Sequence, residues 1–127
     1  RVLIRNRIYK LNYSHSYCTI IMERFKIANH ISELEFAENN IAVADVNGKK
    51  ICVARFREQY FAFAYQCPHA GGILAEGHID ATGNVVCPVH RYKFSIINGY
   101  NSSGEGFFLK RWPVEIREDG VFLNLSF

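Results

Sequence analysis

The fold of this chain is decided by two short stretches, Cys67-Pro68-His69-Ala70-Gly71-Gly72 and Cys87-Pro88-Val89-His90. Each stretch supplies one cysteine and one histidine, and 17 residues separate His69 from Cys87. Proline and glycine suit tight turns, so we expect both stretches to form loops between strands. Two thiolates and two imidazoles make a four-ligand site for a borderline-soft metal.

The spacing of these ligands bears on the identity of the metal. A Cys₂His₂ set could hold a structural zinc tetrahedrally. Zinc sites usually pair like ligands, as in CxxC or HxxxH, whereas here the pairs are mixed, CxH and CxxH. Mixed pairs allow both cysteines to hold one iron and both histidines the other, as in a [2Fe–2S] centre in which His₂ replaces Cys₂ on one iron.

Outward from these loops, the sequence predicts short strands separated by turns. Asn47-Gly48 and Asp119-Gly120 each indicate a hairpin, because both residue types tolerate positive φ. No helical periodicity is sustained, so the fold class is predicted to be all-β, a sandwich or small barrel of antiparallel strands. The expected strands are residues 25–28, 41–46, 50–55, 60–65, 84–86, 92–96, 110–117 and 121–125.

Residues 1–21 differ from the rest of the chain because they carry four basic groups and no acid. They lack the apolar core of a secretory signal, and a transit peptide is a less favoured interpretation. We expect Met22 to be the natural start and residues 1–21 to be an N-terminal extension upstream of the native chain, with no function for His15 or Cys18. Residues 22–127 are expected to form a single domain.

Composition and charge exclude several classes of protein. With 49% apolar and 21% charged residues, the chain is of ordinary globular composition. Residues 22–127 hold eleven basic and twelve acidic groups, so neither nucleic acid nor a membrane is expected as a partner. No apolar run approaches the ~20 residues of a membrane span. Cys52 is expected to be a buried inert thiol and His30 and His78 to be exposed, and the unpaired thiols favour the cytoplasm.

The motif in these loops resembles the Rieske family. The resemblance covers about residues 24–125, and it implies three stacked antiparallel sheets with a tip formed by two loops, about residues 65–94, that bind one [2Fe–2S] cluster per chain. It also implies that Cys67 and Cys87 ligate the buried iron, whereas His69 and His90 ligate the outer iron, which is the one reduced. The stretches that carry the resemblance are residues 67–74, Gly77, residues 87–94, Leu109, residues 112–114 and residues 119–120.

The sequence departs from some members of that family in ways that affect the expected potential. Respiratory Rieske proteins have a disulfide between the two loops, and here Gly72 and Val89 stand in those places. Their Ser and Tyr correspond to Tyr92, which is too long to act as that Ser does, and to Phe94, which has no hydroxyl. Fewer hydrogen bonds therefore reach the cluster sulfurs, and we expect the low end of the roughly −150 to +300 mV Rieske range. Two further departures are Arg91, where the family most often has glycine, and residues 99–106, which lack the usual proline.

The resemblance implies a soluble Rieske-type ferredoxin, an electron-transfer component and not an enzyme. It would carry one electron at a time from a flavin-dependent reductase to a terminal oxygenase. An alternative within the family is a small Rieske-like subunit of a reductase such as nitrite reductase. An alternative from another class is a structural zinc-binding module.

Overall fold

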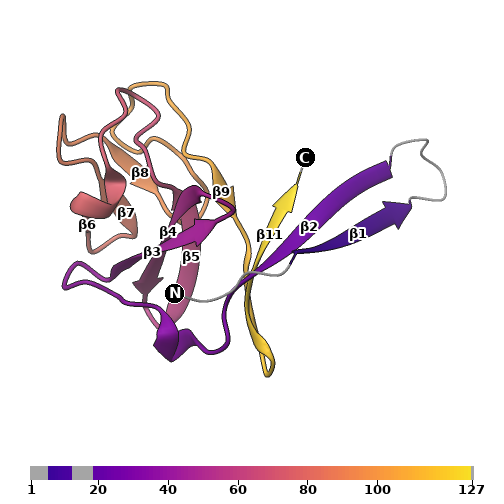
Figure 1. Cartoon of the computed structure of the whole chain (residues 1–127). Helices are drawn as coiled ribbons and strands as arrows, with labels where there is room; N and C mark the ends of the chain where they lie inside the picture. The colour runs from indigo at the N-terminus through magenta and orange to yellow at the C-terminus, as the bar shows by residue number, and fades with distance from the viewer. Residues whose placement is uncertain (1–5, 13–18, 127) are drawn as a thin grey trace.

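The computed structural model describes residues 6–12 and 19–126, which form three antiparallel sheets (Figure 1). The all-β prediction is therefore confirmed. The first sheet has the order β1 (Asn6–Asn12), β2 (Thr19–Ala28), β11 (Gly120–Ser126), β10 (Val114–Arg117). The second has the order β3 (Ile41–Val46), β4 (Lys49–Phe56), β5 (Gln59–Ala64), β9 (Arg111–Trp112). The third has the order β6 (His78–Ile79), β7 (Asn84–Val86), β8 (Lys93–Ser95). Two 3₁₀ turns, η1 (Ile31–Glu33) and η2 (Leu74–Glu76), join them.

Two tight hairpins build the second sheet. The β3–β4 turn is the predicted Asn47-Gly48, with φ of 52° and 83°, which is the left-handed backbone that a two-residue hairpin needs. The β4–β5 turn adopts positive φ at Arg57 (50°) and Glu58 (64°), without a glycine. The guanidinium of Arg57 lies over the ring of Phe56 and donates to the Ala81 carbonyl at 2.9 Å, which helps to hold this unfavourable backbone.

The first core lies between the first and second sheets and forms the base of the molecule. In β4 its residues Ile51 and Val53 alternate with Cys52 and Ala54, which are buried on the opposite face of the same sheet. Burial of each large side chain stabilises the fold by about 1.5–3 kcal/mol. The members include Phe25, Ile27, Val46, Ile51, Val53, Trp112, Val121 and Leu123.

A second core lies on the other side of the second sheet, against the third sheet. It contains both loop cysteines, Cys67 and Cys87, at 4% and 2% exposure. The loops are thus rooted in a packed apolar layer that also includes Cys52, Phe63, Leu74, Val85, Phe94, Ile96 and Leu109.

Several predicted boundaries were wrong. β2 begins at Thr19, not at residue 25, and its residues 19–25 pair with β1. The predicted strand 110–117 is split between β9 and β10 at Pro113, which has no amide to donate to a ladder. The second predicted hairpin is present, but its turn is residues 118–119, because Gly120 already pairs with Arg117. Strands β1 and β6 were not predicted.

The described part of the chain contains no helix with the length and apolar character that a membrane crossing requires.

Candidate metal centre

The first ligand loop, residues 67–72, joins the end of β5 to η2. The amide of Cys67 donates to the Gly72 carbonyl at 2.6 Å, and the amide of Gly71 donates to the Cys67 carbonyl at 3.1 Å. Gly71 has φ of 72°, which a glycine adopts without strain. A bridge between Gln66 and Ile73 closes the base of the loop.

The second ligand loop, residues 87–92, joins β7 to β8 and repeats this backbone pattern. The amide of Cys87 donates to the Tyr92 carbonyl at 2.9 Å, and the amide of Arg91 donates to the Cys87 carbonyl at 2.9 Å. Arg91 has φ of 61°, so it occupies the same left-handed position as Gly71 in the first loop. This explains why glycine suits this position, and it identifies Arg91 as a locally strained residue.

The two cysteine side chains meet at the buried end of the site, where the Cys67 thiol interacts with that of Cys87. Burial raises the pKa of the Cys67 thiol and the neighbouring Cys87 raises it further, whereas the amides of His69 and Ala70 act in the opposite direction. Those amides point at the sulfur and would stabilise a thiolate held by a metal.

The two histidine side chains meet at the outer end of the site. The ring centroids of His69 and His90 lie 4.9 Å apart, with His69 half-buried and His90 exposed. Tyr92 lies against the His69 ring, with centroids 4.3 Å apart, and Phe107 contacts the same ring from another element at 5.2 Å. Sequence reasoning did not single out Phe107, because an aromatic residue in a glycine-rich loop carries no metal signal.

This arrangement fits a two-iron cluster. A zinc tetrahedron needs four ligands around one point, whereas here the thiols pair at the buried end of the site and the imidazoles pair at its outer end. The four side chains form a buried thiol pair and a surface imidazole pair, which is the donor set of a Cys₂His₂ [2Fe–2S] centre.

The positions of the absent disulfide lie next to each other. A Cβ built on Gly72 would lie 3.4 Å from the Cβ of Val89 and 2.7 Å from its Cγ2. Disulfide-bonded residues have Cβ atoms about 3.5–4.5 Å apart. Gly72 and Val89 therefore occupy the two ends of a bridge that these residues cannot form, and Cys52, Cys67 and Cys87 are free.

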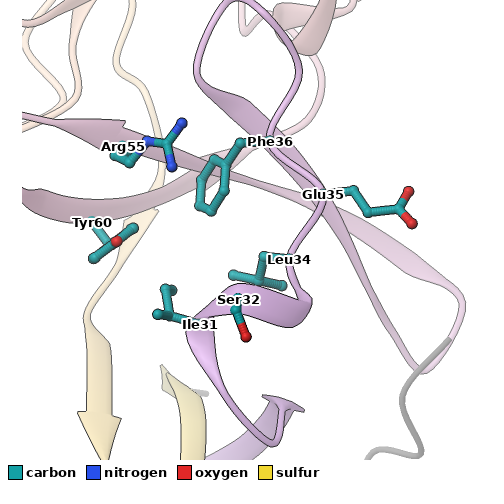
Figure 2. A pocket seen from close by; sticks show the side chains of 7 residues that line it. All are labelled: Ile31, Ser32, Leu34, Glu35, Phe36, Arg55 and Tyr60. Carbon is teal, nitrogen blue, oxygen red and sulfur yellow. The ribbon is translucent and has the colours of Figure 1, made fainter.

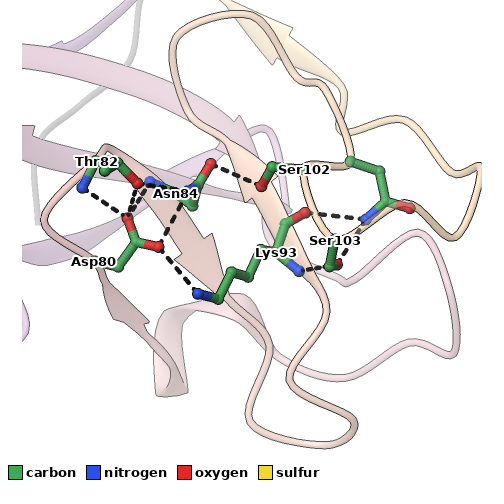
Figure 3. Close-up of polar contacts among 7 residues, drawn as sticks. Asp80, Thr82, Asn84, Lys93, Ser102 and Ser103 are labelled. Carbon is green, nitrogen blue, oxygen red and sulfur yellow. Dashed lines mark hydrogen bonds and ion pairs between the residues drawn. The ribbon is translucent and has the colours of Figure 1, made fainter.

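A polar network supports the β7–β8 hairpin that carries the second ligand loop (Figure 3). The carboxylate of Asp80 accepts hydrogen bonds from the amides and side chains of Thr82 and Asn84, and it pairs with Lys93 at 3.6 Å. Burial alone would raise the pKa of Asp80, but the hydrogen bonds from Asn84 and Thr82 hold it well below its ordinary range. The Ser102 hydroxyl donates to Asn84 at 2.9 Å and ties the network to residues 99–107.

The remaining candidate residues lie apart from this site. Cys52 is fully buried, and desolvation raises its pKa to about 12, as expected of an inert thiol. His30 and His78 are exposed, as predicted, and His30 caps η1 by accepting from the Ser32 amide. His15 and Cys18 lie outside the described residues.

An open hollow of about 500 Å³ lies beside η1 (Figure 2). Tyr60 lines it at the start of β5, whereas the first ligand loop follows the end of that strand. The hollow is therefore separate from the metal centre. Its lining residues are Ile31, Ser32, Leu34, Glu35, Phe36, Arg55 and Tyr60.

The fold and the paired donor set together are typical of an iron–sulfur domain. Residues 25–105 match the model of the Rieske [2Fe–2S] domain, and the chain belongs to that family. This confirms the resemblance seen in the two loops.

Three similar proteins are all distant from this chain in sequence. The ferredoxin component of an alkene monooxygenase system from Xanthobacter autotrophicus is 23% identical over 87 residues, 68% of this chain and 71% of the relative. A chain from a complex of reduced oxygenase and oxidized ferredoxin in carbazole 1,9a-dioxygenase has 24% identity and a TM-score of 0.66, over 79% of this chain and 91% of that one. A chain assigned as the small subunit of an NADH-dependent nitrite reductase from Mycobacterium tuberculosis has 13% identity and a TM-score of 0.66, over 84% and 96%.

Proposed function

We propose that Cys67 and Cys87 bind the inner iron of one [2Fe–2S] cluster per chain, and that His69 and His90 bind the outer iron. The order of burial supports this assignment, because both thiols lie in the second core and both imidazoles lie at the surface. The cluster, when bound, supplies a centre that takes up and returns one electron at a time. The second core keeps water from the thiolates, and the amides of His69 and Ala70 stabilise the sulfur of Cys67.

The protein is then a one-electron carrier that takes electrons from a flavin-dependent reductase and passes them to a terminal oxygenase. The single observation that carries this proposal is the imidazole pair, with His90 exposed and His69 half-buried, over a buried thiol pair, because electron transfer requires one edge of the cluster to come close to a partner. Two relatives support the oxygenase end of this path: one is a ferredoxin component of a monooxygenase system, and another comes from a complex of an oxygenase and a ferredoxin.

The tip around the histidines is the proposed docking surface. Val89 is 56% exposed, and its neighbours Pro88 and Arg91 are exposed as well. The first loop adds Ala70 and Gly71, both exposed, with Pro68 half-buried beside them. A tip of this size suits a weak, transient contact, as a carrier that visits two partners needs.

The chain's own residues favour a reduction potential at the low end of the Rieske range. Any oxidised Cys₂His₂ cluster is formally neutral, so it accepts an electron more readily, at a higher potential, than an all-cysteine cluster of charge about −2. Phe94 is fully buried beside the cysteines and offers no hydroxyl to the sulfurs. With no such donor and no brace between Gly72 and Val89, the potential falls at the low end of the Rieske range.

One experiment tests the carrier function. The holo-protein, reduced with dithionite, is mixed with oxidised cytochrome c as a one-electron acceptor, and both visible spectra are followed in a stopped-flow instrument. We expect one electron per cluster to reach cytochrome c, with the cluster spectrum restored afterwards. Loss of iron on reoxidation, or retention of the electron, would contradict the proposal. The Cys67→Ser protein, which is expected to lack the cluster, provides the blank.

The fixed reductase subunit remains the second candidate, since the nitrite reductase small subunit shares the fold. Gel filtration of a native extract separates the two functions. A carrier elutes near its own 14.6 kDa, whereas a subunit elutes with a large partner. A carrier is also expected to reside in the reducing cytoplasm, where the free thiol of Cys52 is stable.

A further inference from the structure

The 99–107 loop is held against the metal centre by one buried side chain. Asn101 is 7% exposed, and its Oδ1 accepts from the amides of Glu105 at 2.9 Å and Phe107 at 3.2 Å. Its Nδ2 donates to the carbonyl of Lys93, the residue that follows the second ligand loop, at 3.0 Å. Asn101 thus fixes the loop to β8 and sets the positions of Glu105 and Phe107.

One of the two positioned residues contacts His69, and the other carries a charge. The Phe107 ring packs edge-on against the His69 ring at 5.2 Å. Two residues earlier in the sequence, the exposed Glu105 carboxylate accepts from the Ser103 hydroxyl at 2.5 Å and from the Asn101 side-chain amide at 2.9 Å. These bonds fix the position of the carboxylate on the loop.

The Glu105 carboxylate carries a fixed negative charge. The hydrogen bond from Ser103 is the largest influence that holds the pKa of Glu105 below its ordinary value, and Asn101 and the charge interaction with His69 act in the same direction. The Ser103 hydroxyl is itself fixed, because it accepts from the Lys93 amide at 2.8 Å. The charge is therefore held in one place on the loop whose Phe107 packs against His69.

Two cations lie on neighbouring segments, β8 and the second ligand loop. Lys93 is paired with Asp80 at 3.6 Å. Arg91 is exposed and follows His90 in the sequence. The Glu105 carboxylate interacts with the half-buried imidazole of His69.

We propose that the negative charge of the Glu105 carboxylate lowers the reduction potential of the histidine-ligated edge of the cluster. The inference rests on the proposed carrier function. Reduction takes one electron from an external donor and changes the cluster from formally neutral to −1, with no bond broken. A fixed carboxylate beside His69 opposes that added negative charge, so the oxidised form is favoured.

The test compares potentials of holo-proteins equilibrated with a one-electron viologen dye. Glu105→Gln keeps the shape and the hydrogen bonds but removes the charge, and it should shift the electron-exchange equilibrium toward the reduced cluster by on the order of two- to fivefold. Glu105→Lys should shift it further in the same direction. Glu118→Gln, in the exposed turn of the first sheet, should leave it unchanged.

Two further measurements separate charge from loop structure. Ser103→Ala loosens the loop but keeps the carboxylate, so it should shift the equilibrium less than Glu105→Gln. The difference between parent and Glu105→Gln should shrink as salt is raised, because the Debye length falls from about 30 Å at 0.01 M to about 3 Å at 1 M.

The outcomes distinguish this proposal from the carrier function. An unchanged or lower potential in Glu105→Gln, or an equal shift in Ser103→Ala, would overturn the role of Glu105 while leaving the carrier intact. A parent protein that binds no iron would overturn the carrier function itself.

Discussion

The two ligand loops follow the same backbone path with different residues on it. In each loop, the cysteine amide donates to the carbonyl of the residue five positions later, and the amide of the residue four positions after the cysteine donates to the cysteine carbonyl. The histidine, however, stands two residues after Cys67 but three after Cys87, and the left-handed position holds Gly71 in one loop and Arg91 in the other. The comparison teaches that backbone hydrogen bonds define the loop, whereas ligand spacing and even the residue at positive φ can vary within it.

The loops also differ in what supports them. The first loop runs from β5 into η2, with a single bridge at its base. The second is the end of the β7–β8 hairpin and is braced by the Asp80 network. We expect the first loop to depend more on the bound cluster and the second more on the protein.

The largest expected effect comes from removing either cysteine. Cys67→Ser and Cys87→Ser should each abolish the cluster, because neither loop alone supplies two thiolates, and metal binding is coupled to folding. Iron counted per chain measures this. Cys52→Ala, which removes a thiol of the same core that is not a ligand, should keep its iron. A full iron content in either serine variant would show that the loops do not form one site.

The second-largest effect, on stability, is expected from a disulfide that joins the two loops. The double variant Gly72→Cys, Val89→Cys should form a disulfide, since the Cβ positions lie 3.4 Å apart. Closing a loop of this length stabilises a chain by about 3 kcal/mol in the entropic account. The close approach of a Gly72 Cβ to Cys87 Sγ, 2.9 Å, will offset part of that gain. Thiols titrated on the unfolded chain should equal those of the parent; two additional thiols would refute the predicted juxtaposition.

Removing the brace should weaken the second loop selectively. Asp80→Ala breaks several hydrogen bonds, so we expect a loss of about 1–3 kcal/mol in the free energy of unfolding by urea. Asp119→Ala, at an exposed turn, is the matched control and should change little. Equal stability of the two variants would mean that the network does not support the loop.

The same carboxylate predicts a pH dependence. Because the pKa of Asp80 is depressed in the folded state, its contribution is fully present above the unfolded value of about 3.9 and is lost as pH falls through the folded pKa. The parent should therefore lose stability in acid more steeply than Asp80→Ala. Parallel acid-unfolding curves for the two proteins would argue against this contribution.

The smallest effect exchanges the residues at the left-handed position. Gly71→Ala places a side chain at φ of 72° and should cost about 1 kcal/mol. Arg91→Gly relieves the same strain at φ of 61° and should stabilise by about 0.5–1 kcal/mol, because the gain exceeds the added freedom of the unfolded chain. Opposite signs in urea unfolding support the equivalence of the loops, and equal signs would break it.

Much of the fold could be predicted because its signals are local. Ile41–Val46 and Asn84–Val86 were predicted with the observed bounds, and Asn47-Gly48 forms the expected turn. The strand β6 was missed because two residues carry no periodicity. Pro113 could have indicated the break between β9 and β10, since proline cannot donate to a ladder.

The candidate ligands could be proposed from the sequence, whereas their surroundings could not. The motif indicated the four residues, and the structure pairs the two thiols and the two imidazoles. The burial of Asn101 could not be predicted, because asparagine among serines and glycines indicates an exposed turn. The left-handed position of Arg91 did leave a signal: aligning the two stretches on their cysteines places Arg91 opposite Gly71.

The central claim is that two thiols and two imidazoles hold one two-iron cluster, and the EPR spectrum of the dithionite-reduced protein tests it most directly, with iron and zinc counted on the same sample. The account predicts two irons per chain and a rhombic signal whose average g-value lies below that of all-cysteine clusters. A colourless, EPR-silent sample that contains zinc would contradict it and would make the two loops a structural metal staple.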